Sequence, residues 1–155
     1  MKKLLKAAVP LGMLVAGDAS AETVQVSRNG DREAVAGAEA NFTGRVTVTP
    51  LFGPIAYSNA SGGNVEFAPG ARTVWHTHPA GQTLIVTSGR GWVQQEGGER
   101  VEIKPGDVVS IPPAVKHWHG AADSSSMSHI AITPSVDGQN VSWLEPVTDE
   151  QYRQP

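Results

Sequence analysis

Short stretches of β-favouring residues, separated by turn-forming residues, run through most of this 155-residue chain. They cover residues 45–49, 64–67, 83–87, 91–95, 100–103, 107–111 and 128–133. Most of these stretches contain Val, Ile or Thr, whose branched side chains favour strands. Strands that recur every 8–12 residues or so are typical of a β-sandwich or β-barrel rather than of βαβ units. The pattern therefore predicts a single all-β domain.

The residues between these stretches predict how the strands are connected. Residues 96–99 read Glu-Gly-Gly-Glu, and paired glycines accept the positive φ that a tight hairpin requires. Residues 88–91, Ser-Gly-Arg-Gly, are a similar hairpin signal. Near the C-terminus, Thr148 followed by Asp149 can cap a helix. We therefore expect a short C-terminal helical turn after the strands.

The first residues differ from the rest of the chain. A basic start (residues 1–6) precedes a small apolar stretch (7–15) and an Ala-Ser-Ala sequence (19–21), the order found in a cleaved export signal. We predict that residues 1–21 are this signal, that residues 22–41 form a lead-in segment and that residues 42–155 form the domain. The alternative is an amphipathic N-terminus of a cytosolic protein, which Pro10 and Asp18 keep open. Export predicts a location in the bacterial periplasm.

Charge and composition exclude several classes of partner. Removing residues 1–21 takes away three lysines and one aspartate, a net of +2, so the formal charge falls from −3 to −5. Such a chain has no basic stripe for nucleic acid. The apolar stretch is shorter than the roughly 20 residues that span a bilayer, so we expect no membrane anchor. The chain has no cysteine, and any metal must be bound by His, carboxylate or amide groups.

All five histidines lie between residues 76 and 129. They occur as His76-Thr77-His78, His117-Trp118-His119 and the single His129. Side chains alternate between the faces of a strand, so each His-x-His pair places two imidazoles on one face, about 7 Å apart. Two rings in this arrangement can reach one ion. His119 should therefore point into the same cavity as His117.

Gln82 follows His78 after a Pro-Ala-Gly sequence that is typical of a turn. If a strand resumes at Gln82, its side chain shares a face with Leu84 and places one amide oxygen in an apolar interior. Residues 112–113, Pro-Pro, form a rigid corner just before His117. We therefore predict one divalent metal ion bound by His76, His78, Gln82 and His117.

The joint spacing of these residues resembles the two sequence motifs of the cupins. The chain contains Gly70-x5-His76-x-His78-x3-Gln82-x6-Gly89 and Gly106-x5-Pro112-x4-His117. It departs from the cupin pattern at three positions: Gln82 replaces the usual Glu, Ala114 the usual Gly and Ala121 the usual Asn. The resemblance implies a single-domain cupin fold, a double-stranded β-helix or jelly-roll barrel.

A narrower resemblance, to bacterial manganese-dependent cupin hydroxynitrile lyases of the (R)-mandelonitrile lyase-like group, covers nearly the whole chain after residue 41. It is carried by residues 42–44, 50–52, 69–73, 75–79, 81–87, 116–122 and 147–152. The resemblance implies that His76, His78, Gln82 and His117 bind the metal, most simply Mn²⁺, and that Thr73, His119 and His129 have active-site roles.

The residues themselves bear on these implied roles in different ways. His129 shares a strand face with Ala131 and Thr133. The alternative to an active-site role is that His129 is a hydrogen-bonded histidine of the protein interior. Strict alternation from His76 places Thr73 on the opposite face, so it reaches the cavity only if the strand is irregular. Thr133 stands where the lyases carry a larger polar residue, which bears on substrate preference.

Four neutral ligands leave the +2 charge of the ion uncompensated, so the open positions favour an anion or alkoxide. Such a donor set suits Mn, Fe, Co, Ni or Zn. The resemblance to the lyases then implies reversible cleavage of a small-molecule cyanohydrin to aldehyde and cyanide, with the metal as Lewis acid, His119 as general base and His129 protonating the cyanide.

The alternatives are a metal-dependent oxygenase or isomerase acting on a small oxygenated metabolite, and a non-catalytic module that binds a small molecule or metal. We also expect a homo-oligomer, a dimer or tetramer. Trp143 and Leu144 are candidates for its interface, although they could equally pack on the barrel.

Overall fold

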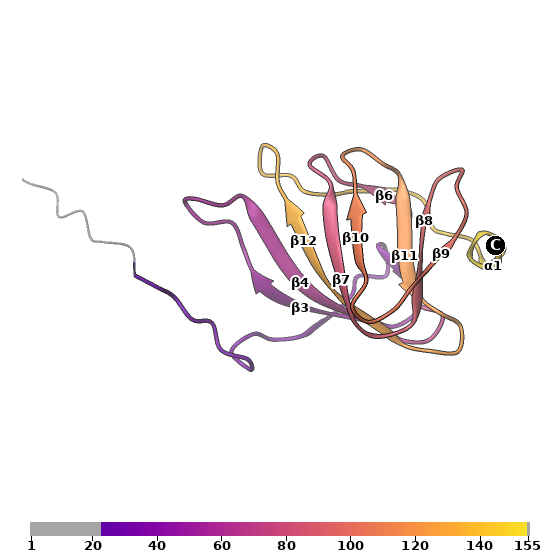
Figure 1. Cartoon of the computed structure of the whole chain (residues 1–155), viewed down its shortest axis with the longest axis horizontal. Helices are drawn as coiled ribbons and strands as arrows, with labels where there is room; N and C mark the ends of the chain where they lie inside the picture. The colour runs from indigo at the N-terminus through magenta and orange to yellow at the C-terminus, as the bar shows by residue number, and fades with distance from the viewer. Residues whose placement is uncertain (1–22, 155) are drawn as a thin grey trace, which may run out of the picture.

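The structure is a computed structural model that describes residues 23–154. The predicted export signal, residues 1–21, lies outside these residues. Within the described range no helix is long and apolar enough to cross a membrane. The lead-in segment contributes one short strand, β1 (Val35–Ala36), and its first described residues, from residue 23 on, extend away from the rest of the molecule (Figure 1).

The prediction of an all-β fold is confirmed: two curled antiparallel sheets form a half-barrel (Figure 1). The first sheet has the strand order β1-β3-β4-β12-β7-β10. Its further strands are β3 (Val46–Phe52), β4 (Ala60–Phe67), β7 (Gln82–Gly89), β10 (Val108–Ile111) and β12 (Met127–Pro134). β12 lies at the centre and pairs with β4 and β7 over most of its length.

The second sheet is built around β11 (His117–Ala121), every residue of which is buried. On one side β11 pairs with β8 (Gly91–Gln95), which also pairs with β9 (Val101–Ile103). On its other side it pairs with two short strands, β5 (Arg72–Thr73) and β6 (His76–Thr77). The sheet is completed by β2 (Phe42–Thr43) beside β5 and β13 (Ser142–Trp143) beside β6.

One of the two hairpin predictions is right and the other is wrong. Residues 96–99 lie between β8 and β9, which pair as a hairpin, and Gly97 has the expected positive φ of 76°. Residues 88–91 are no hairpin, because β7 and β8 belong to different sheets. Gly89 has a φ of 70°, and a Cβ there would overlap the carbonyl oxygen of Ser126. The glycine is needed for a close crossing between sheets, which residue type alone does not distinguish from a hairpin.

The C-terminal helical turn is also confirmed as α1 (Asp149–Arg153). Thr148 accepts from the backbone N–H of Gln151, and the Gln151 side chain accepts from the backbone N–H of Thr148. These two bonds form a capping box. Because the helix is short, its position depends on tertiary contacts, above all on Tyr152, which packs on Trp118.

Apolar side chains fill the space between the sheets. One cluster includes Phe67, Val86 and Met127. The other joins Trp75, Trp118, Val147 and Tyr152. The histidine cluster lies between the sheets as well, since Phe67 contacts both His119 and His129, with ring centroids 5.9 and 5.5 Å apart.

Candidate metal centre and active site

The five histidines gather in one cluster inside the half-barrel. Ring centroids are 4.2 Å apart for His76 and His117, 5.0 Å for His76 and His78, and 5.4 Å for His78 and His117. His119 lies 5.2 Å from His76 and 4.8 Å from His129. Residues far apart in the sequence thus meet at one site.

Strand pairing explains why the two His-x-His motifs meet. His76 on β6 is the direct register partner of His117 on β11. His78 follows β6 in a turn that ends at Gly81, whose φ is 76°, and β7 resumes at Gln82 as the sequence predicted. A Cβ at Gly81 would come within 2.5 Å of the carbonyl oxygen of Ile111, so only glycine fits there.

Three of the histidines are oriented in the same way by main-chain carbonyls. The Nδ1–H groups of His76, His78 and His117 donate to the carbonyl oxygens of residues Val74, Asn140 and Val115, at 2.9, 2.6 and 2.9 Å. A neutral imidazole that donates through Nδ1 carries its lone pair on Nε2. The Nε2 atoms of His78 and His117 are buried without a hydrogen-bond partner. This is the arrangement of metal-ligating histidines.

Gln82 adds a buried oxygen to this set. Its Nε2 donates to Thr133 Oγ1 at 3.0 Å, while its Oε1 is buried without a partner. Leaving a polar oxygen buried and unbonded is costly, so such an atom calls for a ligand. The residues present therefore fit a divalent ion, with nitrogen and amide oxygen atoms available to it.

Ring nitrogens of His76, His117 and His119 all lie within 4.8 Å of one another, which makes these three a candidate metal-binding group. The sequence placed His119 outside the ligand set and His78 inside it. The hydrogen bonds of Nδ1 distinguish His78 from His119. His78 Nδ1 donates to a main-chain carbonyl, as it does in His76 and His117, whereas His119 Nδ1 contacts another imidazole, His129 Nε2, at 3.0 Å. The three-histidine cluster supports a metal site under either assignment.

His119 and His129 form a fully buried pair. Burial, together with the neighbouring imidazoles, holds the pKa of His119 well below its ordinary value. Burial lowers the pKa of His129 to about 4. Both rings are therefore neutral near pH 7. His119 Nε2 and His129 Nδ1 have no partner, so each ring keeps one nitrogen available for proton transfer.

Thr73 lies beside His119 because the chain is irregular between β5 and β6. Val74 and Trp75 separate the two strands, so the alternation that would turn Thr73 away from His76 is broken. Thr73 Oγ1 accepts from the backbone N–H of His119 at 3.2 Å. The hydroxyl thus fixes the position of the His119 main chain.

An apolar cavity of about 460 Å³ lies beside the cluster. Its walls include Phe42, Val65, Ala131, Thr133 and Trp143. Two of its wall residues contact the site: Trp143 packs on His76, with ring centroids 4.9 Å apart, and Thr133 accepts a hydrogen bond from Gln82.

Two residues that contact the histidine cluster, Trp143 and Asn140, were not recognised as site residues from the sequence. Trp143 was considered only for an interface or for packing on the barrel, and Asn140, whose carbonyl accepts from His78, was not singled out. A carbonyl acceptor carries no residue-type signal. A lone tryptophan after the last predicted strand was the only clue to Trp143.

Comparisons with known proteins agree with the motifs. Residues 63–133 match the Cupin domain family. The chain is 52% identical over 130 residues to an (R)-mandelonitrile lyase from Granulicella tundricola, covering 84% of this chain and 99% of that one. The crystal structure of a cupin-like protein from Thermotoga maritima has a TM-score of 0.73 at 46% identity, covering 76% of this chain and 90% of the other.

A more distant structure shows the same fold. The polyketide cyclase RemF from Streptomyces resistomycificus has a TM-score of 0.66 at 17% identity, covering 84% of this chain and 91% of that one. The motif spacing, the half-barrel and the lyase relative lead to one conclusion: the chain belongs to the cupin family.

Proposed function

We propose that this protein cleaves a cyanohydrin reversibly to an aldehyde and cyanide. The observation that carries the proposal is the neutral, buried His119–His129 pair next to a metal-compatible cluster, with an apolar cavity beside it. A relative that spans most of the chain is named (R)-mandelonitrile lyase, which supports this reaction class.

In this proposal His76, His78, Gln82 and His117 hold one divalent ion, with Mn²⁺ the first candidate and Fe, Co, Ni or Zn able to substitute. When bound, the ion supplies Lewis acidity that lowers the pKa of a substrate hydroxyl. His119, the fifth member of the cluster, stays free for proton transfer because its Nδ1 is engaged by His129.

The two free imidazole nitrogens then divide the proton transfers between them. His119 Nε2 takes the hydroxyl proton of the cyanohydrin. The carbon–oxygen double bond forms as the bond to cyanide breaks, and the electron pair leaves with the cyanide carbon. His129 stabilises the departing cyanide and gives it the proton on Nδ1, while His129 Nε2 takes a proton from His119 Nδ1 across their 3.0 Å contact. Both rings end neutral, so charge and protons balance. Thr73 keeps His119 in place through the backbone N–H of that residue.

The cavity walls support an apolar substituent on the substrate. Phe42 and Trp143 have ring centroids 5.9 Å apart, and Trp143 extends this aromatic surface to His76. An aryl group resting there would have its carbinol carbon near the histidine cluster, as in mandelonitrile.

The test is His119→Ala, with metal content measured beside activity. General acid–base catalysis contributes roughly 10²–10⁴-fold, so mandelonitrile cleavage should fall by about that factor while one metal per chain remains. His119→Gln is the matched control for the loss of volume and should be equally impaired. Unchanged cleavage with the metal bound would refute the general-base role.

A metal-dependent oxygenase or isomerase is the competing function, since three histidines with open coordination positions also suit oxygen chemistry. A lyase works without oxygen and with several divalent metals, whereas an oxygenase consumes oxygen and requires a redox-active metal. Turnover of no substrate at all would indicate a binding module. We also propose export and self-association, to be tested by N-terminal mass analysis and by light scattering.

A further inference from the structure

The amide of Gln82 has two chemically different ends, and only one of them can face a cation. We propose that Thr133 is a positioning residue that orients this amide so that Oε1, not the NH₂ group, faces the metal. Gln82 Nε2 donates to Thr133 Oγ1 at 3.0 Å, and Oε1 is left buried without a partner. This inference rests on the metal site of the proposed function.

Strand geometry makes this contact a rigid one. Ile132 on β12 pairs with Thr83 on β7, so Thr133 and Gln82 are the next residues along the same ladder. Thr133 is 7% exposed, and its backbone oxygen accepts from Ser61 Oγ at 3.3 Å on the neighbouring strand β4. Little freedom remains for the hydroxyl to leave the amide.

The same hydrogen-bond chain reaches a second proposed ligand. Ser61 Oγ also accepts from Asn140 Nδ2 at 3.1 Å, and the Asn140 carbonyl accepts from His78 Nδ1 at 2.6 Å. Thr133 and Asn140 therefore orient Gln82 and His78 from one side of the site. Partners of metal ligands commonly change metal affinity by about 10–100-fold when they are lost.

Threonine suits a glutamine at this position because its hydroxyl can accept the amide N–H, whereas a valine of nearly the same shape cannot. With valine, the NH₂ group loses its acceptor, and the amide is free to rotate its NH₂ end toward the ion. That orientation places donors against a cation and loses the oxygen ligand.

The experiment compares Thr133→Val with Thr133→Ser in the purified protein. We expect Thr133→Val to bind Mn²⁺ about tenfold or more weakly in competition with a chelator and to shift the visible absorption bands of the Co²⁺-loaded protein. Thr133→Ser keeps the hydroxyl and should retain both properties. Thr87→Val is the matched control, because Thr87 lies on β7 and its hydroxyl donates to the carbonyl of Ser128, not to a proposed metal ligand.

The outcomes separate this inference from the proposed reaction. Wild-type affinity and an unchanged Co²⁺ spectrum in Thr133→Val would overturn the inference even if mandelonitrile is cleaved. Weakened binding in Thr133→Val alone supports it even if no cyanohydrin is turned over. A protein that takes up no stoichiometric metal would overturn the metal site and this inference together.

Discussion

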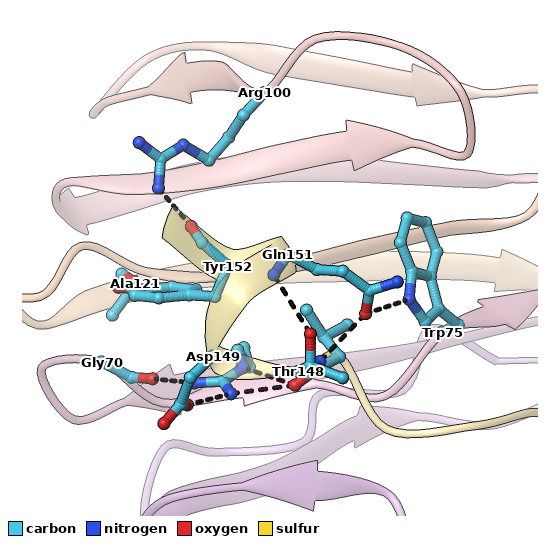
Figure 2. A network of polar contacts seen from close by, with 10 residues as sticks. Gly70, Trp75, Arg100, Ala121, Thr148, Asp149, Gln151 and Tyr152 are labelled. Atoms are coloured by element: carbon cyan, nitrogen blue, oxygen red, sulfur yellow. Dashed lines mark hydrogen bonds and ion pairs between the residues drawn. The ribbon is translucent and has the colours of Figure 1, made fainter. Parts of the chain in front are cut away.

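Arg72 attaches the C-terminal segment to the barrel, and replacing it by methionine should lower stability markedly. Its side chain is 6% exposed. Its Nε and Nη2 donate to the carbonyl oxygen of Val147 at 3.2 and 2.8 Å, and Nη2 also donates to Asp149. Figure 2 labels Asp149 next to Thr148 and Gln151 of the capped helix. The guanidinium lies 4.7 Å from the ring centroid of Tyr152.

The magnitude follows from what methionine leaves behind. Val147 is 1% exposed, so its carbonyl loses two donors in a place that water does not reach. An unsatisfied buried acceptor costs about 1–3 kcal/mol, and the lost cation–π contact adds up to about 1–2 kcal/mol. We expect Arg72→Met to lower the free energy of unfolding by about 2–4 kcal/mol and Tm by roughly 6–15 °C.

Asp149→Asn is the control, because it leaves both Arg72 donors on the Val147 carbonyl and keeps a side-chain oxygen that can accept from Nη2. The carboxylate is 69% exposed, so solvent screens the charge that asparagine removes, and this variant should be less destabilised than Arg72→Met. Urea unfolding of the metal-free protein, followed by circular dichroism and tryptophan fluorescence, measures both. Equal losses in the two variants would refute the reasoning, since the ion pair with Asp149, not the buried carbonyl, would then hold the segment.

Two further predictions concern backbone strain and pH. Ala114 has a φ of 61°, which costs an alanine about 1–2 kcal/mol, so Ala114→Gly should raise the unfolding free energy by about 0.5–1 kcal/mol after the greater flexibility of the unfolded chain is subtracted. A lower Tm in that variant would contradict the strain. The hydrogen bond from Arg72, then its charge, lowers the pKa of Asp149. Because the pKa of Asp149 is lower in the folded state than in the unfolded state, its ionised carboxylate stabilises the fold at pH values above the unfolded pKa of about 4. This stabilisation is lost as the pH falls through the folded-state pKa. The stability difference between wild type and Asp149→Asn should therefore vanish in acid, and a difference that grows in acid would exclude this linkage.

Local patterns were enough to predict most strands and the C-terminal turn. Alternation and turn residues locate β7, β8, β10 and β12 within a few residues, because each depends on neighbours in sequence. The capping box at Thr148 is likewise contained within four residues. Ala114 shows that a motif position can reflect a backbone conformation. Glycine is usual there in the cupin motif because the backbone has a positive φ.

Contacts between segments that are distant in the sequence could not be predicted from these local patterns. The Gly at position 89 indicates a positive φ, but only the pairing of β8 with β11 and β9 shows that the chain changes sheets there. Strict alternation would place Thr73 on the face opposite His76, and the sequence could not tell whether the strand is regular there. The structure interrupts the strand at Val74 and Trp75, and Thr73 Oγ1 accepts from the backbone N–H of His119.

The sequence by itself determined that this is a small all-β cupin in which two His-x-His motifs and a glutamine come together, because motif spacing and side-chain alternation are local properties. Only the tertiary structure decided which atoms are free for chemistry. The carbonyl of Asn140 and the hydroxyl of Thr133 orient His78 and Gln82, and His129 contacts His119 across 3.0 Å. These partners come from other strands and loops, and a hydrogen bond depends on their distance and direction, which no spacing along the chain specifies.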